Sequence, residues 1–474
     1  MTGDTDRPLL ERLSTFAAAE PDPSLAATID ADVHRRVRDI IGISLAAVNS
    51  EPARIVGAMI EAWGGRPEAG CTGRPTRLPA PAAALWGGTL AHALDYDDTH
   101  LPSVLHPSAS VVPAALAAAE ACHATGAELI RAVAVGDELC IRLGMAGYDP
   151  DLANSVFFER GFHATAICGT LGAAAAAASV RRLGRQGIAE AIAIAASMGS
   201  GLLEANRTGG SVKRVHCGWA AHAGVTAAEL AARGLTGPPT VLEGRFGFLQ
   251  AFCGERAHID ALTEGLGESW ELLRLHFKPY PANHFTHAGI DAALALRNEG
   301  VQATRVEDVE LAVAGPMLRT IAEPSDEKAS PHNGYAAKFS GPYTFAAALV
   351  GGGGLGLGLD DFTDESVQDP ERLALAAKVR CVSDPACDEI FPHAFPAVAR
   401  VRMAGGVSHE VRVMHNRGGP DRPLDDDELD RKFRDNAGRA LDPSRVENLE
   451  VALGSLADLP HVGELVALTV PEGP

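Results

Sequence analysis

The sequence predicts a mainly α protein in which a large helical domain is interrupted by a smaller α+β domain. Three observations support this fold class. Apolar residues recur at helical spacing from the N-terminus to about residue 233, strand-like alternation first appears at residues 306–313, and a helical pattern returns after residue 425. A chain of 474 residues also exceeds what one compact core usually holds. We therefore expect a helical domain of residues 1–276 and 415–474 and an α+β domain of residues 277–414.

The individual elements follow from periodicity and from turn residues. Helices of the first domain are expected at residues 9–19, 32–48, 55–63, 126–143, 169–182, 186–197 and 216–233, with loops at 144–151 and 199–214. In the second domain a strand is expected at 306–313, a hairpin at 397–403 and 407–414 around Gly405-Gly406, and helices at 340–349 and 370–379. A helix at 425–433 and helical segments within 446–468 complete the chain.

Composition and charge narrow the classes of partner. Hydrophobic residues make up 46% of the chain but aromatic residues only 5%, so the core should consist of closely packed Ala, Leu and Val side chains. A net charge of −20 argues against nucleic acid or an anionic membrane as a partner. If the substrate is an anion, a local group of Lys, Arg and His must reverse the sign of the potential around it.

No targeting or membrane segment is apparent. The first eight residues are polar without an apolar run behind them, and no apolar stretch is long enough to span a membrane, so we expect a cytoplasmic protein. The eight cysteines are scattered along the chain without the close pairs of a zinc or iron–sulfur site. They are expected to be free, mostly buried thiols.

One stretch, ALWGGTLAHALDYDDTHLPSVLHPSASVVPAALAAAE from residue 84, combines two apolar helices with a polar segment between them. Pro102 and Pro107 prevent a continuous helix, so the polar side chains should lie on a turn between buried helices. We call these side chains the polar cluster: Asp95, Asp97, Asp98, Thr99, His100 and His106. So many ionisable groups between apolar helices indicate a functional site.

The sequence resembles the MmgE/PrpD family through this stretch and four others in the same order. The others are GFHATAICGTLGAAAAAA from residue 161, KRVHCGWAAHAG from 213, FKPYPANHFTHAGID from 277 and AAKFSGPYTFAAAL from 336. The family includes 2-methylcitrate dehydratases, cis-aconitate decarboxylases and iminodisuccinate epimerases. The resemblance implies a helical domain with a smaller α+β lid, a homodimer, a cleft between the domains, and catalysis without a cofactor or metal.

The resemblance carries the family's active-site Asp, Thr and His onto Asp95, Thr99 and His106, and its GFH histidine onto His163. A His beside a carboxylate can exchange protons near neutral pH, so we expect Asp95 to hold His106 as an acid or base. The alternative for Asp97 and Asp98 is that at least one only caps the next segment. For His163 the alternative is a structural histidine in front of an alanine-rich helix.

We expect Lys213, Lys278 and His163 to bind substrate carboxylates and to take part in catalysis. The chain prefers arginine, so a lysine within each motif is distinctive. Two such cations would supply the positive potential that an acidic protein needs, and one could stabilise an enolate-like oxyanion. A surface salt bridge is the alternative for each lysine.

Three further residues come from the resemblance to the second half of the family. Tyr343 corresponds to a tyrosine in the family's cleft and is a candidate acid; a core aromatic with a satisfied hydroxyl is an equal alternative. Asn283 occupies the register in which the family's decarboxylases have a His, and His284 is adjacent, so both are candidates for substrate binding. His287 is taken as structural.

We expect a lyase that transfers a proton next to a carboxylate of a small di- or tricarboxylic acid, with 2-methylcitrate dehydration as the first choice. Decarboxylation of cis-aconitate type and epimerisation of iminodisuccinate type are the alternatives, and a non-catalytic carboxylate-binding protein is a remote one. The glycines after residue 351 are not preceded by a strand, which argues against a dinucleotide loop. DYDDTH lacks the later acid of a terpene-synthase magnesium motif, and the family resemblance argues against a metal phosphohydrolase.

Overall fold

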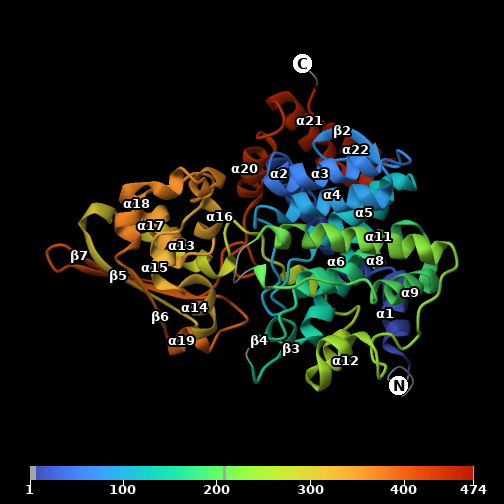
Figure 1. Ribbon diagram of the computed structural model, residues 1–474, viewed down its shortest axis with the longest axis horizontal. Helices are drawn as coiled ribbons and strands as arrows, with labels where there is room; N and C mark the ends of the chain where they lie inside the picture. The colour runs from blue at the N-terminus through green and yellow to red at the C-terminus, as the bar shows by residue number, and fades with distance from the viewer. Residues whose placement is uncertain (1–6, 153, 206–209, 473–474) are drawn as a thin grey trace. The chain divides into compact units, whose positions relative to one another are not determined.

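A computed structural model describes residues 7–152, 154–205 and 210–472 and divides into two compact units. The first unit consists of Met1–Leu275 and Phe433–Pro474, and the second of His276–Lys432. The second unit thus extends to Lys432, whereas the sequence analysis ends its α+β domain at residue 414. The expected fold class, mainly α with a smaller α+β part, is confirmed (Figure 1).

The first unit is helical. Its helices are α1 (Leu9–Ala18), α2 (Pro23–Ala47), α3 (Glu51–Trp63), α4 (Ala80–His92), α5 (Ser108–Ala121), α6 (Gly126–Ala146), α7 (Val156–Glu159), α8 (Ala164–Val180), α9 (Gly184–Ala195), α11 (His216–Ala232), α12 (Phe248–Phe252), α21 (Pro443–Gly454) and α22 (Gly463–Leu468). α20 (Asp426–Ala437) begins in the second unit and ends in the first. Two short hairpins, β1 (Ala69–Cys71) with β2 (Arg74–Leu78) and β3 (Tyr148–Asp149) with β4 (Asn154–Ser155), and the 3-10 turn η1 (Val212–Val215) lie between helices.

α8 is the centre of this unit and packs against α5, α6 and α11 (Figure 1). Every residue of α8 but one is buried, and most are Ala or Gly. Small side chains let neighbouring helices approach closely. A methyl group added at Gly172 would stand 2.6 Å from the Gly136 carbonyl of α6, and one at Gly224 would stand 2.5 Å from Ala173. The alanine-rich composition therefore produces the tight core that the sequence indicates.

α4 and α11 cross equally closely. A Cβ at Gly88 would lie 2.7 Å from the Cys217 carbonyl oxygen, and a Cβ at Gly218 would lie 2.4 Å from the Leu85 carbonyl oxygen. Such distances leave no room for any side chain on either helix at the crossing. The crossing brings the end of α4, with His92, beside the start of α11.

Gly218→Ala should therefore destabilise the first unit and disturb the site described below. The new methyl group meets backbone atoms, which cannot move aside, so we expect a loss of about 1–3 kcal/mol in unfolding free energy. Gly454→Ala is the matched control, because a Cβ there meets nothing within 4 Å. Urea unfolding of both variants checks this prediction, and equal stability of the two would contradict it.

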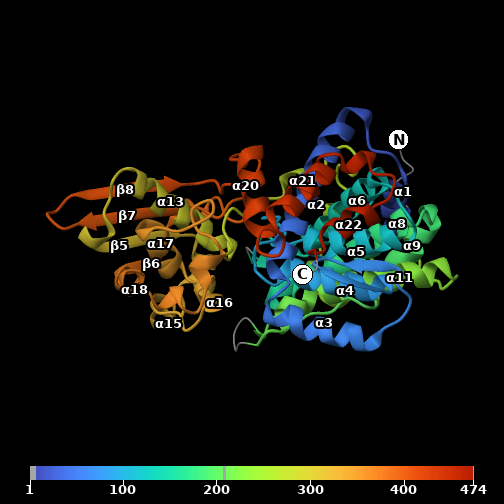
Figure 2. The same cartoon turned by 90° about the horizontal axis from the view of Figure 1, so that it is seen from above.

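The second unit contains one four-stranded sheet. Its strands are β5 (Val306–Val313), β6 (Val379–Ser383), β7 (Ala397–Met403) and β8 (Ser408–Val413), in the order β6-β5-β7-β8. Only the β5–β6 pair is parallel. The helices are α13 (His287–Asn298), α14 (Gly315–Ile321), α15 (Ser325–Ala329), α16 (Gly334–Ala337), α17 (Gly341–Val350), α18 (Pro370–Ala376) and α19 (Pro385–Asp388). α13 packs on β7, on β8 and on α17 (Figure 2).

Most elements expected in the second unit are confirmed. β5 has the predicted bounds, and β7 and β8 form the hairpin whose turn contains Gly405 and Gly406, both with positive φ. The helix expected over residues 370–379 ends at Ala376, and residue 379 instead begins β6. In the first unit, residues 206–209 of the expected loop at 199–214 lie outside the described residues.

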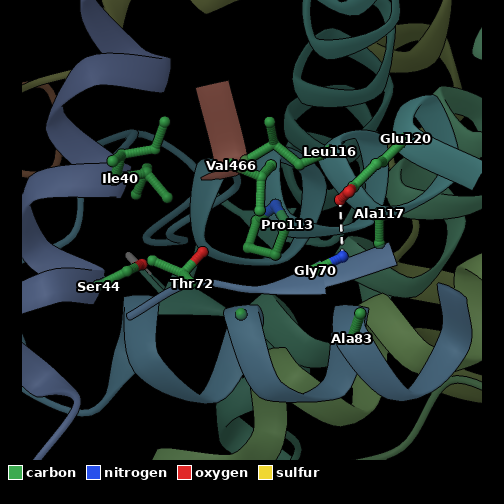
Figure 3. Close-up of a pocket in the computed structure, with 12 residues that line it drawn as sticks. Ile40, Ser44, Gly70, Thr72, Ala83, Pro113, Leu116, Ala117, Glu120 and Val466 are labelled. Atoms are coloured by element: carbon green, nitrogen blue, oxygen red, sulfur yellow. Dashed lines mark hydrogen bonds between the residues drawn. The ribbon is translucent and has the colours of Figure 1, made fainter. Parts of the chain in front are cut away.

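One small cavity in the first unit lies between α2, α4, α5 and β1 (Figure 3). Its volume of about 20 Å³ is enough for about one water molecule. Glu120 points toward it and accepts a hydrogen bond of 2.7 Å from the Gly70 N–H. The cavity is too small for a carboxylic acid substrate.

The remaining expectations concern membranes and cysteines. Within residues 7–152, 154–205 and 210–472, we find no helix with the length and apolarity needed to cross a bilayer. All eight cysteines are free thiols, and six of them are buried, as expected.

Candidate active site

The polar cluster lies on the loop between α4 and α5, and a buried ion pair anchors this loop to α2. Arg36 of α2 is 2% exposed and binds Asp32 through two nitrogens at 3.0 Å each. It also donates to the Leu275 carbonyl at 2.9 Å, and its Nη1 stands 3.8 Å from Asp98 Oδ2. Arg36 thus balances the charge of a carboxylate that is only 1% exposed.

Asp98 belongs to a buried pair of carboxyl groups joined by Ser108. The Ser108 hydroxyl is within hydrogen-bond distance of Asp98 Oδ2 and lies 2.9 Å from Oδ2 of Asp137 on α6. A hydroxyl donates only one hydrogen bond, so one of the two carboxyls must be protonated and donate to it. Burial and the Asp98 charge raise the pKa of Asp137 well above its usual value, so we assign this proton to Asp137.

Because of this buried carboxyl pair, we expect the free energy of unfolding to fall as pH rises. Burial raises the pKa of Asp98 from 3.8 to about 6, although Arg36 opposes the shift. A carboxyl whose pKa is higher in the folded state stabilises the fold below its unfolded pKa, and loses that contribution as pH rises through the folded pKa. Wild-type protein should lose roughly 1–3 kcal/mol from this source between about pH 4 and pH 7.

Asp137→Asn tests the assignment. The amide has the same size and can donate to Ser108 without titrating, so the variant should lose less stability over this pH range than the wild type. Urea unfolding at a series of pH values measures the slope for both proteins. Identical slopes would show that Asp137 carries no proton in the folded state.

His106 is held in one orientation by the same loop. Its Nδ1 lies 2.6 Å from the Asp98 carbonyl oxygen and 3.2 Å from Thr99 Oγ1, and its backbone N–H donates to Thr165 of α8 at 3.3 Å. A carbonyl can only accept, so Nδ1 carries a hydrogen and Nε2 is the nitrogen that exchanges protons. The sequence analysis gives Asp95 the role of holding this ring; the contacts described here are with the Asp98 carbonyl and Thr99.

Asp95 pairs with Lys213. Lys213 lies on η1 and is 8% exposed, and its Nζ stands 3.8 Å from Asp95 Oδ2. Asp95 adopts a φ of 55°, in the left-handed region that Asp tolerates better than most residues. Such backbone strain commonly marks positions where the surrounding structure fixes a functional side chain. The burial of Lys213 excludes the surface salt bridge that the sequence left open.

His163 stands at the start of α8 beside His216 at the start of α11. Their Nδ1 atoms are 3.0 Å apart, so one ring donates a hydrogen to the other. Burial, followed by the positive charges of His92 and Lys213, keeps the pKa of His163 well below its usual value. Burial and the same two charges lower the pKa of His216 to about 4. Both rings are therefore neutral at physiological pH.

His92 connects these groups. Its ring centroid lies 5.6 Å from that of His106 and 5.6 Å from that of His163. Its Nδ1 is 2.7 Å from Asp97 Oδ2, and both side chains are buried. Burial disfavours the charged ring, but the Cys217 sulfur and the Asp97 carboxylate outweigh it and raise the pKa of His92 to about 10.

The expectation that Asp97 or Asp98 caps the next segment is wrong. Asp97 binds His92, and Asp98 binds Ser108 and lies near Arg36. No side chain caps the start of α5.

In the second unit, three candidates lie close together in sequence at its N-terminal end. Lys278 is completely buried, which excludes a surface salt bridge for it as well. Asn283 accepts a hydrogen bond from the Phe285 N–H at 3.1 Å and caps the 3-10 turn η5 (His284–Thr286). His284 is 3% exposed, and its ring centroid is 4.5 Å from that of His287. His287 contacts the Ala282 carbonyl oxygen at 3.1 Å, as a structural histidine would.

Tyr343 is a core aromatic rather than a candidate acid. It is completely buried in α17, and its hydroxyl lies 3.0 Å from the Asp361 carbonyl oxygen and 3.2 Å from that of Ser366. Burial raises its pKa, and Arg372 lies 3.4 Å from the hydroxyl. The hydroxyl donates its hydrogen to backbone carbonyls of the second unit. The structure therefore favours the alternative of a core aromatic with a satisfied hydroxyl.

Comparison with known proteins identifies the family. Residues 11–259 match the MmgE/PrpD N-terminal domain, and residues 280–458 match the MmgE/PrpD C-terminal domain. The chain belongs to the MmgE/PrpD family. The chain is accordingly an enzyme, as the sequence analysis expects.

Curated relatives of this MmgE/PrpD protein cover almost its whole length. A cis-aconitate decarboxylase-like protein oryM of Aspergillus oryzae is 28% identical over 467 residues, which is 93% of each chain. The cis-aconitate decarboxylase of Homo sapiens is 29% identical over 441 residues, covering 92% of this chain and 89% of its own. That of Aspergillus terreus is 27% identical over 409 residues, covering 83% and 81%.

Sequence reasoning missed several residues that this MmgE/PrpD protein places at the site. Asp137 is a carboxylate within the apolar run AVAVGDELC, and such an interruption is a usable signal for a buried pair. His216 lies in the same quoted motif as Lys213. His92 and Cys217 also lie in quoted motifs, but nothing in the sequence shows that they meet, because only the close crossing of α4 and α11 brings them together.

Proposed function

We propose that this protein is a lyase that decarboxylates a small unsaturated tricarboxylic acid of the cis-aconitate type. The observation that carries the proposal is the convergence, in the first unit, of a buried lysine, an oriented histidine and a neutral histidine pair on one loop and two helix starts. Relatives that match over most of both chains are named for this reaction. The sequence placed 2-methylcitrate dehydration first, and the names of these relatives reverse that order.

The residues suit the electronic demands of decarboxylation. When the C–C bond to one carboxylate breaks, CO₂ leaves and the electron pair remains on the adjacent carbon, where the neighbouring double bond delocalises it. Lys213 supplies a buried positive charge that stabilises the negative charge as it develops. His106, with Nδ1 held by the Asp98 carbonyl, delivers the proton from Nε2 that completes the product.

His163 and His216 fit a role in binding and positioning. Both are neutral, so they can donate or accept hydrogen bonds without adding to the charge of the site. Thr99 orients His106, and Asp95 positions Lys213. We further propose that Lys278, Asn283 and His284 bind substrate carboxylates. We also propose that the protein is a homodimer and that it is cytoplasmic.

Dehydration of a 2-methylcitrate-type hydroxy acid is the second candidate. Asn283 favours it, because the family's decarboxylases carry a His in that register. In this protein the Asn283 side chain caps η5 and thereby has a structural use. Both reactions pass through a carbanion next to a carboxylate, so the same residues can serve either.

Proton NMR in D₂O separates these candidates. The protein is incubated in turn with cis-aconitate, citrate, 2-methylcitrate and itaconate. Release of CO₂ from cis-aconitate, with one deuterium in the product, is the expected result. Loss of water from 2-methylcitrate alone would transfer the assignment to the dehydratase. His461→Gln, at an exposed histidine, is the control that should retain activity, and absence of turnover and exchange throughout would overturn the proposal.

A further inference from the structure

Three buried side chains that the proposed mechanism does not use meet beside the catalytic histidines. They are His92 at the end of α4, Asp97 on the following loop and Cys217 in the first turn of α11. One ligand atom from each lies within 4.8 Å of the other two. Their exposed fractions are 3%, 0% and 0%. The group is formed by the crossing of Gly88 and Gly218, which fixes α4 against α11.

The set of donor atoms matches the requirements of one kind of cation. An imidazole nitrogen, a carboxylate oxygen and a thiolate sulfur are the three ligand types of protein zinc sites, and three protein ligands leave a fourth position for water. Ligand atoms around one tetrahedral Zn²⁺ stand roughly 3.3–3.7 Å apart, given metal–ligand bonds of about 2.0–2.3 Å. His92 Nδ1 and Asp97 Oδ2, now 2.7 Å apart, would therefore have to separate slightly to ligate one ion, whereas any pair near the 4.8 Å limit would have to close. A thiolate ligand disfavours the hard cations Mg²⁺ and Ca²⁺.

Charge balance and the unpaired Nε2 of His92 also favour a bound divalent cation. A thiolate and a carboxylate together neutralise a divalent cation, so the complex with a neutral imidazole carries no net charge, which suits its complete burial. Among the described residues, His92 Nε2 is buried without a hydrogen-bond partner. A buried donor atom of this kind can be satisfied when the ring turns or shifts to bind a cation.

We propose that His92, Asp97 and Cys217 form a binding site for a thiophilic divalent cation, with Zn²⁺ as the best match. Binding itself is independent of the enzymatic reaction. Its consequence for turnover rests on the proposed function: a cation held by His92 stands next to His106 and His163, whose ring centroids are each 5.6 Å from that of His92. Binding would shift the His92 ring from its present contact with Asp97, and both neighbouring rings pack against it, so occupancy should inhibit the enzyme.

Cobalt is the probe for the site because a cobalt–thiolate bond gives a charge-transfer absorption band. Full-length protein, reduced and freed of metal by a chelator, is titrated with Co²⁺. We expect about one Co²⁺ per chain, a thiolate band, and loss of the band when Zn²⁺ displaces the probe. Cys217→Ser should abolish the band and weaken binding by more than the roughly 10- to 100-fold typical of losing an outer-shell partner.

Cys122→Ser is the matched control, because Cys122 is one of two partly exposed cysteines and is an obvious adventitious ligand. This variant should keep both the band and the affinity. His92→Asn should also weaken binding, and circular dichroism shows whether each variant is folded. Absence of a thiolate band in the wild type, or a band that survives Cys217→Ser and disappears in Cys122→Ser, would overturn the proposal. Because the readout is spectroscopic, it tests the cation site independently of which substrate the enzyme uses.

Discussion

Replacing Lys213 by Met should lower kcat/KM by about 10²- to 10³-fold while the fold stays intact. Methionine keeps the apolar stem of the side chain but removes the charge that, in the proposed mechanism, stabilises the developing carbanion. Lys213 suits this role because it is 8% exposed and stands 3.8 Å from Asp95. An electrostatic contact is worth more in such a water-poor site than on the surface. Steady-state kinetics with the substrate identified by NMR measures the effect.

Arg214→Met is the matched control for this experiment. Arg214 lies on the same 3-10 turn as Lys213, and its Nη1 is 3.8 Å from Glu51, whose side chain is 54% exposed. Its loss should change the rate little, because partly exposed ion pairs contribute little. Lys213→Arg separates charge from shape and should recover only part of the activity. A Lys213→Met enzyme with normal kcat and raised KM would make Lys213 a binding residue only.

The sequence carried enough information for the fold class but not for every element. Strand β5 and the β7–β8 hairpin were predictable, because their side chains alternate and glycines mark the turn. Strand β6 was not, because it pairs in parallel with β5, which lies far from it in sequence. Local propensity at residue 379 resembles the end of a helix, and only this distant pairing makes the segment a strand.

The same limit applies to the candidate site. The polar cluster was visible because carboxylates and imidazoles interrupt two apolar helices. Their partners were not visible, because His106 is held by a backbone carbonyl, and Asp98 is balanced by an arginine from α2. Tyr343 shows the opposite error. Its motif suggested chemistry, yet its hydroxyl satisfies backbone carbonyls in the core of the second unit.

The largest loss of stability is expected from Arg36→Met. Arg36 is 2% exposed and is the cation that faces both Asp32 and Asp98. Its removal leaves buried negative charge and an unpaired Leu275 carbonyl. Breaking a buried ion pair by deleting one partner costs about 3–5 kcal/mol. Urea unfolding should show this loss, whereas Arg54→Met, at an exposed position on α3, should stay within about 0.5 kcal/mol of wild type.

A second substitution identifies the cause of this loss. If uncompensated charge on Asp98 is responsible, Asp98→Asn in the Arg36→Met background should restore part of the stability, because it removes the charge that Arg36 balanced. In the wild-type background the same change should stabilise less, because Arg36 already offsets part of the cost of burying the Asp98 charge. The two substitutions should therefore be non-additive, with a coupling of about 1–3 kcal/mol in the double-mutant cycle. Strict additivity would show that Arg36 stabilises the loop through packing and its bond to Leu275 alone.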